Sequence, residues 1–180
     1  VMLLDILSNG SRPWIVLKHV NAMFQGIKEI GLSGDPAMTV ENFVSNEGEK
    51  VEISKTGKLK LSGKVENYLN ELIEKMRNEF RAKLGDTIAD YDKTGQGGKA
   101  RPEWLKGQVA QLALVTTQQQ WTVKTEEALA KMSKGVDKDA LKTYYAFQLE
   151  MLADMIKTVQ GDMPKLQRRA AMNVITLEAH

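Results

Sequence analysis

The chain has 180 residues, of which 42% are hydrophobic and 27% are charged, and this composition is ordinary for one compact globular domain or two small ones. The 25 Lys and Arg residues nearly balance the 23 Asp and Glu residues, and a formal net charge of only +2 argues against a nucleic-acid-binding protein. Because there is no cysteine, disulfides, thiolate metal sites and cysteine nucleophiles are excluded.

The sequence shows no targeting or membrane signal. No apolar run approaches the roughly 20 residues of a membrane span, so we expect no membrane partner. The chain starts at Val1 without the basic and apolar stretches of a signal peptide, and we expect it to be a segment of a longer polypeptide.

The first 36 residues predict two helices. Residues 2–7 are typical of a helix end, and Gly10 suits the left-handed backbone that closes one. A second helix is expected from Ser11, because Pro13 is tolerated in a first turn and apolar residues recur every three or four positions as far as Ile27. Residues 31–36, GLSGDP, break this pattern.

Residues 40–61 predict a β-hairpin. Val51, Glu52 and Ile53 alternate apolar and polar side chains, as a half-buried strand does, and the turn is expected near Gly48. Residues 59–61 extend the hairpin.

The remaining chain predicts long helices. The first covers about residues 64–91 and would be roughly 40 Å long, and the Gly-rich residues 92–101 follow it as a loop. Further helices are expected over residues 102–132, 137–160 and 162–177, with Asp137 and Asp162 as caps.

Long helices joined by short loops pack antiparallel. The sequence therefore predicts a mainly α fold, an elongated bundle of long antiparallel helices with one β-hairpin insertion. We divide it into residues 1–62, with short helices and the hairpin, and residues 63–180, the long-helix bundle.

No catalytic or metal-binding group is apparent. The run from Gly95 to Ala100 departs from a phosphate-binding loop, because Ala100 stands where a hydroxyl must hold Mg²⁺. Residues 90–101 resemble the start of a calcium-binding loop, but Arg101 replaces the acidic twelfth residue. The two histidines, His19 and His180, are far apart in the sequence. We expect a segment without catalytic activity.

Two surface features remain open. Lys165, Arg168 and Arg169 form a basic patch that is either a solvated helix face or a contact for an acidic partner. Trp104 and Trp121 are expected to share one face of one helix, where they would lie in the core or anchor a partner.

Several segments, in order, resemble the linker of the dynein heavy chain, specifically its C-terminal part, which precedes the first AAA+ ATPase module. They are LLDILS (3–8), followed by Pro13, His19 and Phe24; SNEGEKV (45–51); LSGKVENYL (61–69); Gln108-Val109 through Gln119, Trp121-Thr122 and EEAL (126–129); and LQRR (166–169) with ITLEAH (175–180). Tyr68 departs from the family pattern, which usually has Trp there. The sequences of the first helix and of the LSGKVE segment (61–66) are more similar to axonemal than to cytoplasmic dyneins.

The resemblance implies a non-catalytic mechanical linker segment of an ATP-driven microtubule motor. Its partners would be the AAA+ ring of the same heavy chain, microtubules and other dynein subunits. Its location would be cytoplasmic and cytoskeletal, in the axoneme of a cilium or flagellum. The segment would hold no cofactor, and ATP with Mg²⁺ would bind beyond residue 180. Candidate packing or ring-contact positions are Glu47, Gly48, Trp104, Gln108, Trp121, Arg168 and His180. The alternative is a stand-alone helical adaptor that binds a protein through the Trp104 and Trp121 face.

Overall fold

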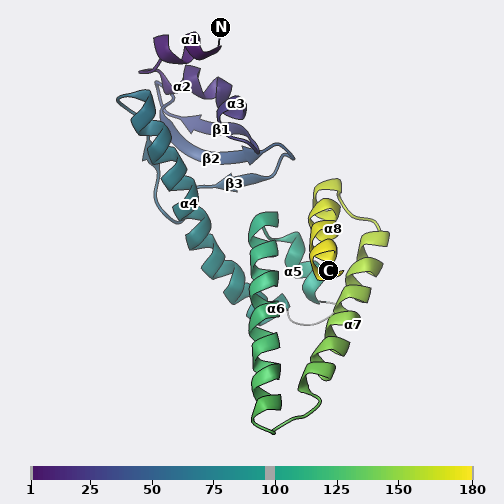
Figure 1. Cartoon of the computed structure of the whole chain (residues 1–180). Helices are drawn as coiled ribbons and strands as arrows, with labels where there is room; N and C mark the ends of the chain where they lie inside the picture. Colours follow the sequence, from purple (N-terminus) through teal and green to yellow (C-terminus); the bar gives the residue numbers. More distant parts are fainter. Residues whose placement is uncertain (1, 96–99, 180) are drawn as a thin grey trace. The chain divides into compact units, whose positions relative to one another are not determined.

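The computed structural model describes residues 2–95 and 100–179. The chain is mainly α-helical with a small antiparallel sheet, as predicted (Figure 1). It divides into two compact units, residues 1–83 and 84–180, and the division falls within helix α4 (Val65–Asp90). The predicted domain boundary after residue 62 lies before this helix and stays a prediction.

The first unit contains three short α-helices, a 3₁₀ turn and four strands before α4. The helical elements are α1 (Met2–Ser8), α2 (Pro13–Val16), η1 (Leu17–His19) and α3 (Val20–Met23). The strands are β1 (Ile27–Ser33), β2 (Thr39–Ser45), β3 (Lys50–Glu52) and β4 (Leu59–Lys60).

The sheet is antiparallel and centred on β2. Strand β1 pairs along one edge of β2, with Ile30 opposite Phe43, while β3 and β4 share the other edge. Phe43 also lies opposite Val51 of β3, and all three side chains are buried. The predicted hairpin at residues 40–61 is therefore confirmed, including its turn near Gly48.

The predicted helix that extends from Ser11 to Ile27 is wrong. Its backbone becomes extended at Phe24, and Gly26 has a φ of +89°, which is accessible to glycine and ends the helical stretch. Ile27 then begins β1, and Gly31, predicted to lie in a break, is inside that strand. The spacing of apolar residues continued across the change of structure, so periodicity alone did not reveal it.

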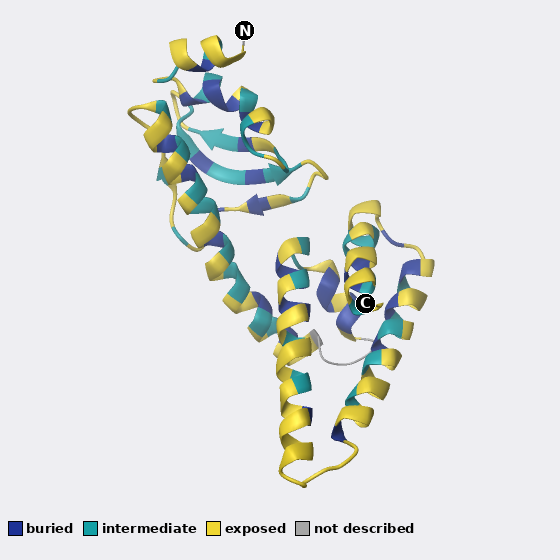
Figure 2. Ribbon diagram, in the orientation of Figure 1, coloured by how far each residue is buried: buried dark blue, intermediate teal, exposed yellow. Residues whose placement is uncertain are grey.

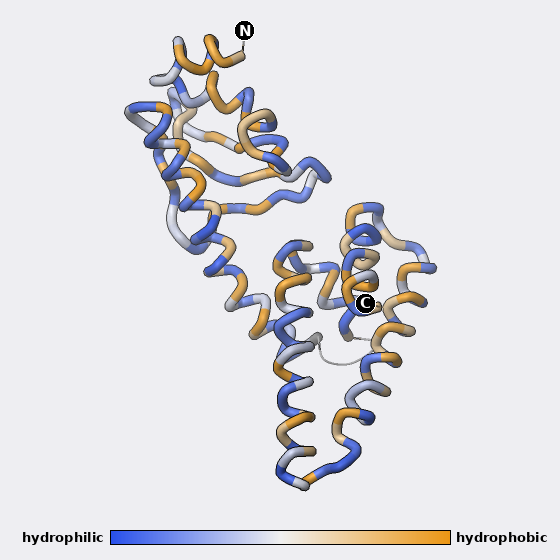
Figure 3. The backbone as a smooth tube through the Cα atoms, in the orientation of Figure 1, coloured by the Kyte–Doolittle hydropathy of each residue, from blue (hydrophilic) through white to orange (hydrophobic). Residues whose placement is uncertain are grey.

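Helix α4 covers 26 residues, close to the predicted range. Hydrophobic and hydrophilic residues alternate along it at helical intervals (Figure 3). Tyr68 and Leu72 are fully buried in the first unit, together with Val16, Val40 and Leu61.

The second unit contains η2, a π-helical turn (Tyr91–Gly95), and the helices α5 (Ala100–Lys106), α6 (Ala110–Ser133), α7 (Ala140–Gln160) and α8 (Lys165–Ala179). The predicted single helix over residues 102–132 is wrong, because the backbone is extended at Val109 and separates α5 from α6. Asp137 does not cap α7 directly. It accepts the Asp139 N–H at 3.0 Å, and Asp139 occupies the N-cap position.

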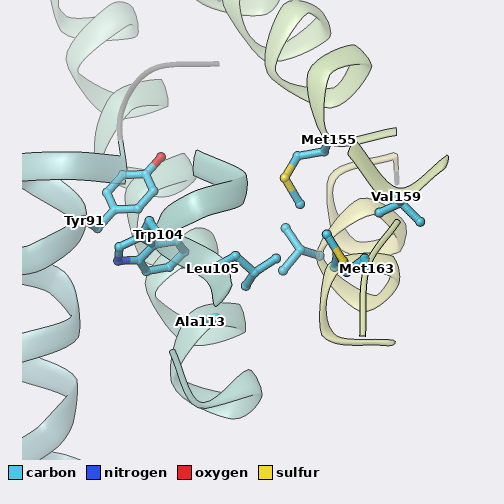
Figure 4. Packing of buried hydrophobic residues seen from close by; sticks show 9 residues of the cluster. Tyr91, Trp104, Leu105, Ala113, Met155, Val159 and Met163 are labelled. Atoms are coloured by element: carbon cyan, nitrogen blue, oxygen red, sulfur yellow. The ribbon is translucent and has the colours of Figure 1, made fainter. Parts of the chain in front are cut away.

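The core of the second unit lies where these helices meet. It contains Tyr91, Trp104, Leu105, Ala113, Met155, Val159, Met163, Ala171 and Val174 (Figure 4). Helices α6 and α7 are antiparallel and adjacent, but α1–α3 have seven residues or fewer, so the described helices do not all join one bundle of long helices. None of the helices in the described parts of the chain is long and apolar enough to cross a bilayer.

Candidate functional site

A buried carboxylate on α4 anchors this helix in the first unit. Glu79 has no exposed surface, and its Oε1 accepts the Ser54 N–H at 2.9 Å and the Lys55 N–H at 3.0 Å. Its Oε2 accepts the Thr56 N–H at 3.0 Å and the Thr56 hydroxyl at 2.8 Å. The carboxylate therefore joins α4 to three consecutive backbone amides in the segment between β3 and β4.

These hydrogen bonds keep Glu79 ionised. Burial alone raises the pKa of the carboxyl, because it disfavours the charged form. The hydrogen bonds from the backbone of Ser54, Lys55 and Thr56 and from the Thr56 hydroxyl outweigh burial and lower the pKa from 4.5 to about 2. Lys83, one turn later on α4, lies 3.4 Å from Glu79 Oε1 and adds a partly buried cation. We call this group the Glu79 anchor.

A second buried polar group lies in the second unit. Arg101 of α5 forms an ion pair with Glu178 of α8, and both side chains are at least nine-tenths buried. Arg101 Nη2 also donates to the Thr117 hydroxyl of α6 at 3.2 Å. One side chain thus joins three helices, α5, α6 and α8.

An aromatic ring, that of Tyr91, lies beside this ion pair. The Arg101 guanidinium lies 5.8 Å from the centre of the Tyr91 ring, and Tyr91 meets Trp104 edge to face with ring centres 4.9 Å apart (Figure 4). Burial raises the pKa of Glu178 and outweighs the attraction of Arg101, and burial also raises the pKa of Tyr91.

The predicted site residues do not form one cluster. Glu47 is exposed in the β2–β3 turn, and the adjacent Gly48, with a φ of +90°, donates its N–H to the Ser45 carbonyl at 2.9 Å. Gln108 donates to Asp90 Oδ2 at 2.8 Å and so joins the α5–α6 break to the end of α4. His180 lies outside the described residues.

The predicted face formed by Trp104 and Trp121 does not exist. The two residues lie on separate helices, α5 and α6, and Trp104 is 4% exposed whereas Trp121 is 54% exposed. The break at residues 107–109 removes the helical register that would place them on one side. An adaptor that binds through this pair is therefore ruled out.

One residue of the basic patch on α8, Arg168, forms hydrogen bonds within the protein. Arg168 Nη2 donates to the Gly161 carbonyl at 3.0 Å and lies 3.5 Å from the Met163 carbonyl, so it ties the start of α8 to the α7–α8 connection. Lys165 is exposed. Arg168 thus has a structural role that the sequence pattern did not indicate.

Neither candidate ion-binding loop gains support from the described part of the chain. Asp90 and Asp92 accept hydrogen bonds from Gln108 and Gln120, respectively. Across residues 2–95 and 100–179, no three His, Asp or Glu side chains come together as metal ligands would. Residues 96–99 of the Gly-rich run lie outside the described residues.

Sequence reasoning missed the Glu79 anchor and the Arg101–Glu178 pair. Glu79 lies seven residues after Leu72, two helical turns on, and so on the buried face of α4. A charge within the apolar stripe was the available signal. Nothing in the sequence pairs Arg101 with Glu178, because 77 positions separate them.

Comparison with known proteins decides the family. The sequence model of a family described as "Dynein heavy chain, N-terminal region 2" matches residues 2–87. The flagellar outer-arm dynein alpha chain of Chlamydomonas reinhardtii is 36% identical over 99% of this chain. The chain belongs to the dynein heavy chain family. The resemblance found in the sequence is confirmed, but the matching model describes an N-terminal region of the heavy chain rather than the C-terminal part of the linker.

Two further dynein relatives match along the same length. Human dynein axonemal heavy chain 9 is 32% identical, and the ciliary dynein beta chain of Tripneustes gratilla is 30% identical, each over 99% of this chain. The chain spans 4% of the length of each of these relatives.

Proposed function

We propose that this chain is a non-catalytic mechanical segment of a dynein heavy chain linker, the arm that transmits nucleotide-dependent changes of the AAA+ ring into the power stroke. Its partners would be the ring of the same heavy chain and, through the whole complex, microtubules and other dynein subunits. ATP with Mg²⁺ would bind in the parent chain beyond residue 180. The names of the relatives, flagellar, ciliary and axonemal dyneins, favour an axonemal location.

The Glu79 anchor is the observation that carries this proposal. A long helix can transmit force only if its attachment resists being pulled loose, and a single hydrogen bond contributes only about 1 kcal/mol. Here two carboxylate oxygens accept from three consecutive residues, so the attachment of α4 rests on several hydrogen bonds at once. Both oxygens of the buried Glu79 carboxylate form hydrogen bonds that join α4 to the segment between β3 and β4.

The proposal is tested by weakening this anchor in the parent motor. We expect Glu79→Gln in the full-length heavy chain to preserve microtubule-stimulated ATP hydrolysis but to slow microtubule gliding, because α4 would yield instead of transmitting movement. The measurement compares the ATPase rate and the gliding velocity of the same preparation. Glu74→Gln is the matched control, since Glu74 is an exposed residue of the same helix that pairs with exposed Arg77.

Two outcomes would contradict the proposal. One is normal gliding by a Glu79→Gln motor whose segment is shown to unfold more readily in denaturant. The other is equal slowing by the Glu74→Gln control, which would show that the effect does not arise at the anchor.

A further inference from the structure

The second unit contains a pocket of about 300 Å³ between α6 and α7, and the linker role does not explain it. Its aromatic lining comes from Tyr91 of η2, Trp121 of α6, and Tyr144 and Phe147 of α7. The rings of Tyr144 and Phe147 are stacked, with their centres 6.5 Å apart. Glu178, near the end of α8, also lines the pocket. The pocket is large enough for one large apolar side chain.

Helix α8 runs toward this pocket. Val174 belongs to the core of the second unit together with Ala113 of α6 and Met155 of α7. One turn later on α8, Glu178 lies at the pocket with residues further along α6, such as Trp121, and with earlier residues of α7. Helix α8 is therefore parallel to α6 and antiparallel to α7, and it packs against both (Figure 1). Its direction follows α6 and α7 toward the turn that joins them.

The pocket is bounded on the side of this turn by a contact between α6 and α7. Ala128 of α6 and Ala140 of α7 are both buried, although the two helices are otherwise mostly exposed toward the turn (Figure 2). Small side chains allow two helices to approach closely, so α6 and α7 are packed together there. The pocket thus occupies the stretch of α6 and α7 between this contact and the end of α8.

The charged residues at the pocket already have partners. Arg101 and Glu178 form the buried ion pair described above, and Lys124 pairs with the exposed Glu127 at 3.0 Å. A charged occupant would have to compete with these pairs and would also lose its hydration. The aromatic lining instead suits an uncharged, apolar side chain.

Two of the aromatic side chains at the pocket are open to solvent. Trp121 is 54% exposed and Phe147 is 40% exposed. Large apolar side chains that gather around a hollow are typical of a surface that another segment covers. We therefore looked for the segment that can reach them.

The segment that follows α8 in a heavy chain has an advantage over a separate protein. Because Glu178 lines the pocket, residues soon after it are already close to Trp121 and Phe147. A covalently attached group has an effective concentration of the order of millimolar, so it covers such a surface before a free partner does. The chain spans 4% of the length of its relatives, so a heavy chain of this family has ample further sequence.

We propose that the heavy-chain segment directly after residue 180 continues along α6 and α7 and inserts a large apolar side chain among Trp121, Tyr144 and Phe147. This inference rests on the proposed function in one respect, since it takes the chain as part of a heavy chain that continues past residue 180.

Helical geometry indicates where this side chain lies in the sequence. A helix rises 1.5 Å per residue, so one or two further turns of α8, about four to eight residues, span the pocket. The inward-facing stripe of Val174 and Glu178 continues at about positions 181–182 and 185. One of these positions carries the inserted side chain.

The first test is photocross-linking in the full-length heavy chain. Trp121 is replaced by p-benzoylphenylalanine, the motor is irradiated, and the joined peptides are identified by mass spectrometry. We expect residue 121 to cross-link to the peptide that begins directly after residue 180. The matched control places the same group at Leu129, which is similarly exposed on α6 but does not line the pocket. It should give about tenfold less of this product, because eight residues of helix place it about 12 Å further along.

The second test is hydrogen exchange of the same full-length motor. In Trp121→Ala, amides of the segment after residue 180 should exchange several-fold faster, because its apolar side chain loses part of its cover. Leu129→Ala should leave their exchange unchanged. Peptides from α7 should exchange as in the natural chain, which shows that α6 and α7 remain packed.

Three results would overturn the proposal. Residue 121 could cross-link to a distant part of the heavy chain or to another subunit, which would identify a different occupant. Its cross-links could all fall within residues 84–180, which would show that the pocket stays uncovered. Exchange after residue 180 could also be the same in Trp121→Ala and in the natural motor.

These outcomes are distinct from the test of the proposed function. Normal gliding by a Glu79→Gln motor would contradict the mechanical role but would leave the cross-link from residue 121 in place. Conversely, slowed gliding by Glu79→Gln without this cross-link would support the mechanical role and contradict the contact at the pocket.

Discussion

The hydroxyl of Tyr68 is buried in the first unit without a hydrogen-bond partner among the described residues. Burial raises the pKa of this phenol, so it stays neutral, and the unpaired group is a cost to the folded state. We expect Tyr68→Phe to leave the free energy of unfolding unchanged or to raise it by up to about 1 kcal/mol. Urea denaturation at neutral pH measures the effect.

The control for this substitution is Tyr145→Phe. Tyr145 is 62% exposed, so its hydroxyl is satisfied by water, and its removal should change stability little. A clear loss of stability in Tyr68→Phe alone would show that the hydroxyl has a partner, such as a bound water.

Glu79 makes the stability of the first unit depend on pH. Its pKa is about 2 in the folded chain and 4.5 without the fold, so the folded state favours the ionised form. The contribution is complete above about pH 4.5 and is lost as the pH falls toward 2. It amounts to about 3 kcal/mol, because each pKa unit corresponds to about 1.4 kcal/mol.

Unfolding midpoints measured between pH 7 and pH 2.5 check this expectation. The natural chain should lose stability over this range more steeply than Glu79→Gln, which lacks the titrating group but is less stable at neutral pH. Parallel pH profiles of the two chains would contradict the assignment of the low pKa to Glu79.

At the scale of elements, the Arg101–Glu178 pair joins α5 to α8. We expect Arg101→Met to cost about 3–5 kcal/mol, because it leaves the Glu178 carboxylate buried without its cation. The double variant Arg101→Met with Glu178→Met should recover much of this loss, since two apolar side chains of similar length can pack together. Denaturant titration of four chains, the natural one, Arg101→Met, Glu178→Met and the double variant, gives the coupling energy.

Additive effects of the two substitutions would contradict a stabilising interaction between Arg101 and Glu178. If the two single substitutions each cost little and their effects simply added, Arg101 and Glu178 would not act as a unit in solution. Glu103→Gln on α5, whose exposed carboxylate pairs with Lys106, is the matched control and should be nearly neutral.

Helices and strands could be predicted where the spacing of apolar residues kept one period over many residues. The 26-residue α4 and the two last helices were found from their apolar stripes, and the hairpin from its alternation and Gly48. Strand β1 was missed because its pairing with β2 overrides a helical spacing that runs on to Ile27. The break between α5 and α6 was missed because Gly107 alone is tolerated within a helix.

The candidate sites could be predicted only in part. The family could be identified from the sequence, because many short matching segments follow one another along the chain in the order of the family. Glu79 and the Arg101–Glu178 pair could not be found in this way. The backbone amides that bind Glu79 lie at least 23 positions away, Glu178 lies 77 positions from Arg101, and both arrangements depend on the folded backbone. Local patterns report which residues face inward, but not what they meet there.

For the whole molecule, we expect the isolated 180-residue chain to bind neither Mg-ATP nor Ca²⁺. Ala100 and Arg101 stand where the two ion-binding loops require a hydroxyl and a carboxylate. Calorimetric titration with each ligand checks this expectation. Heat of binding that follows a single-site curve would contradict it and would direct attention to residues 90–101.

The way in which Glu79 is held has a consequence for ionic strength. Salt screens pairs of exposed charges, and the screening length is about 10 Å at 0.1 M. Glu79 is fully buried, and most of its contacts come from backbone amides, which carry no net charge that dissolved ions could neutralise. The attachment of α4 to the segment between β3 and β4 should therefore persist in concentrated salt, whereas an exposed pair such as Glu74 with Arg77 dissociates.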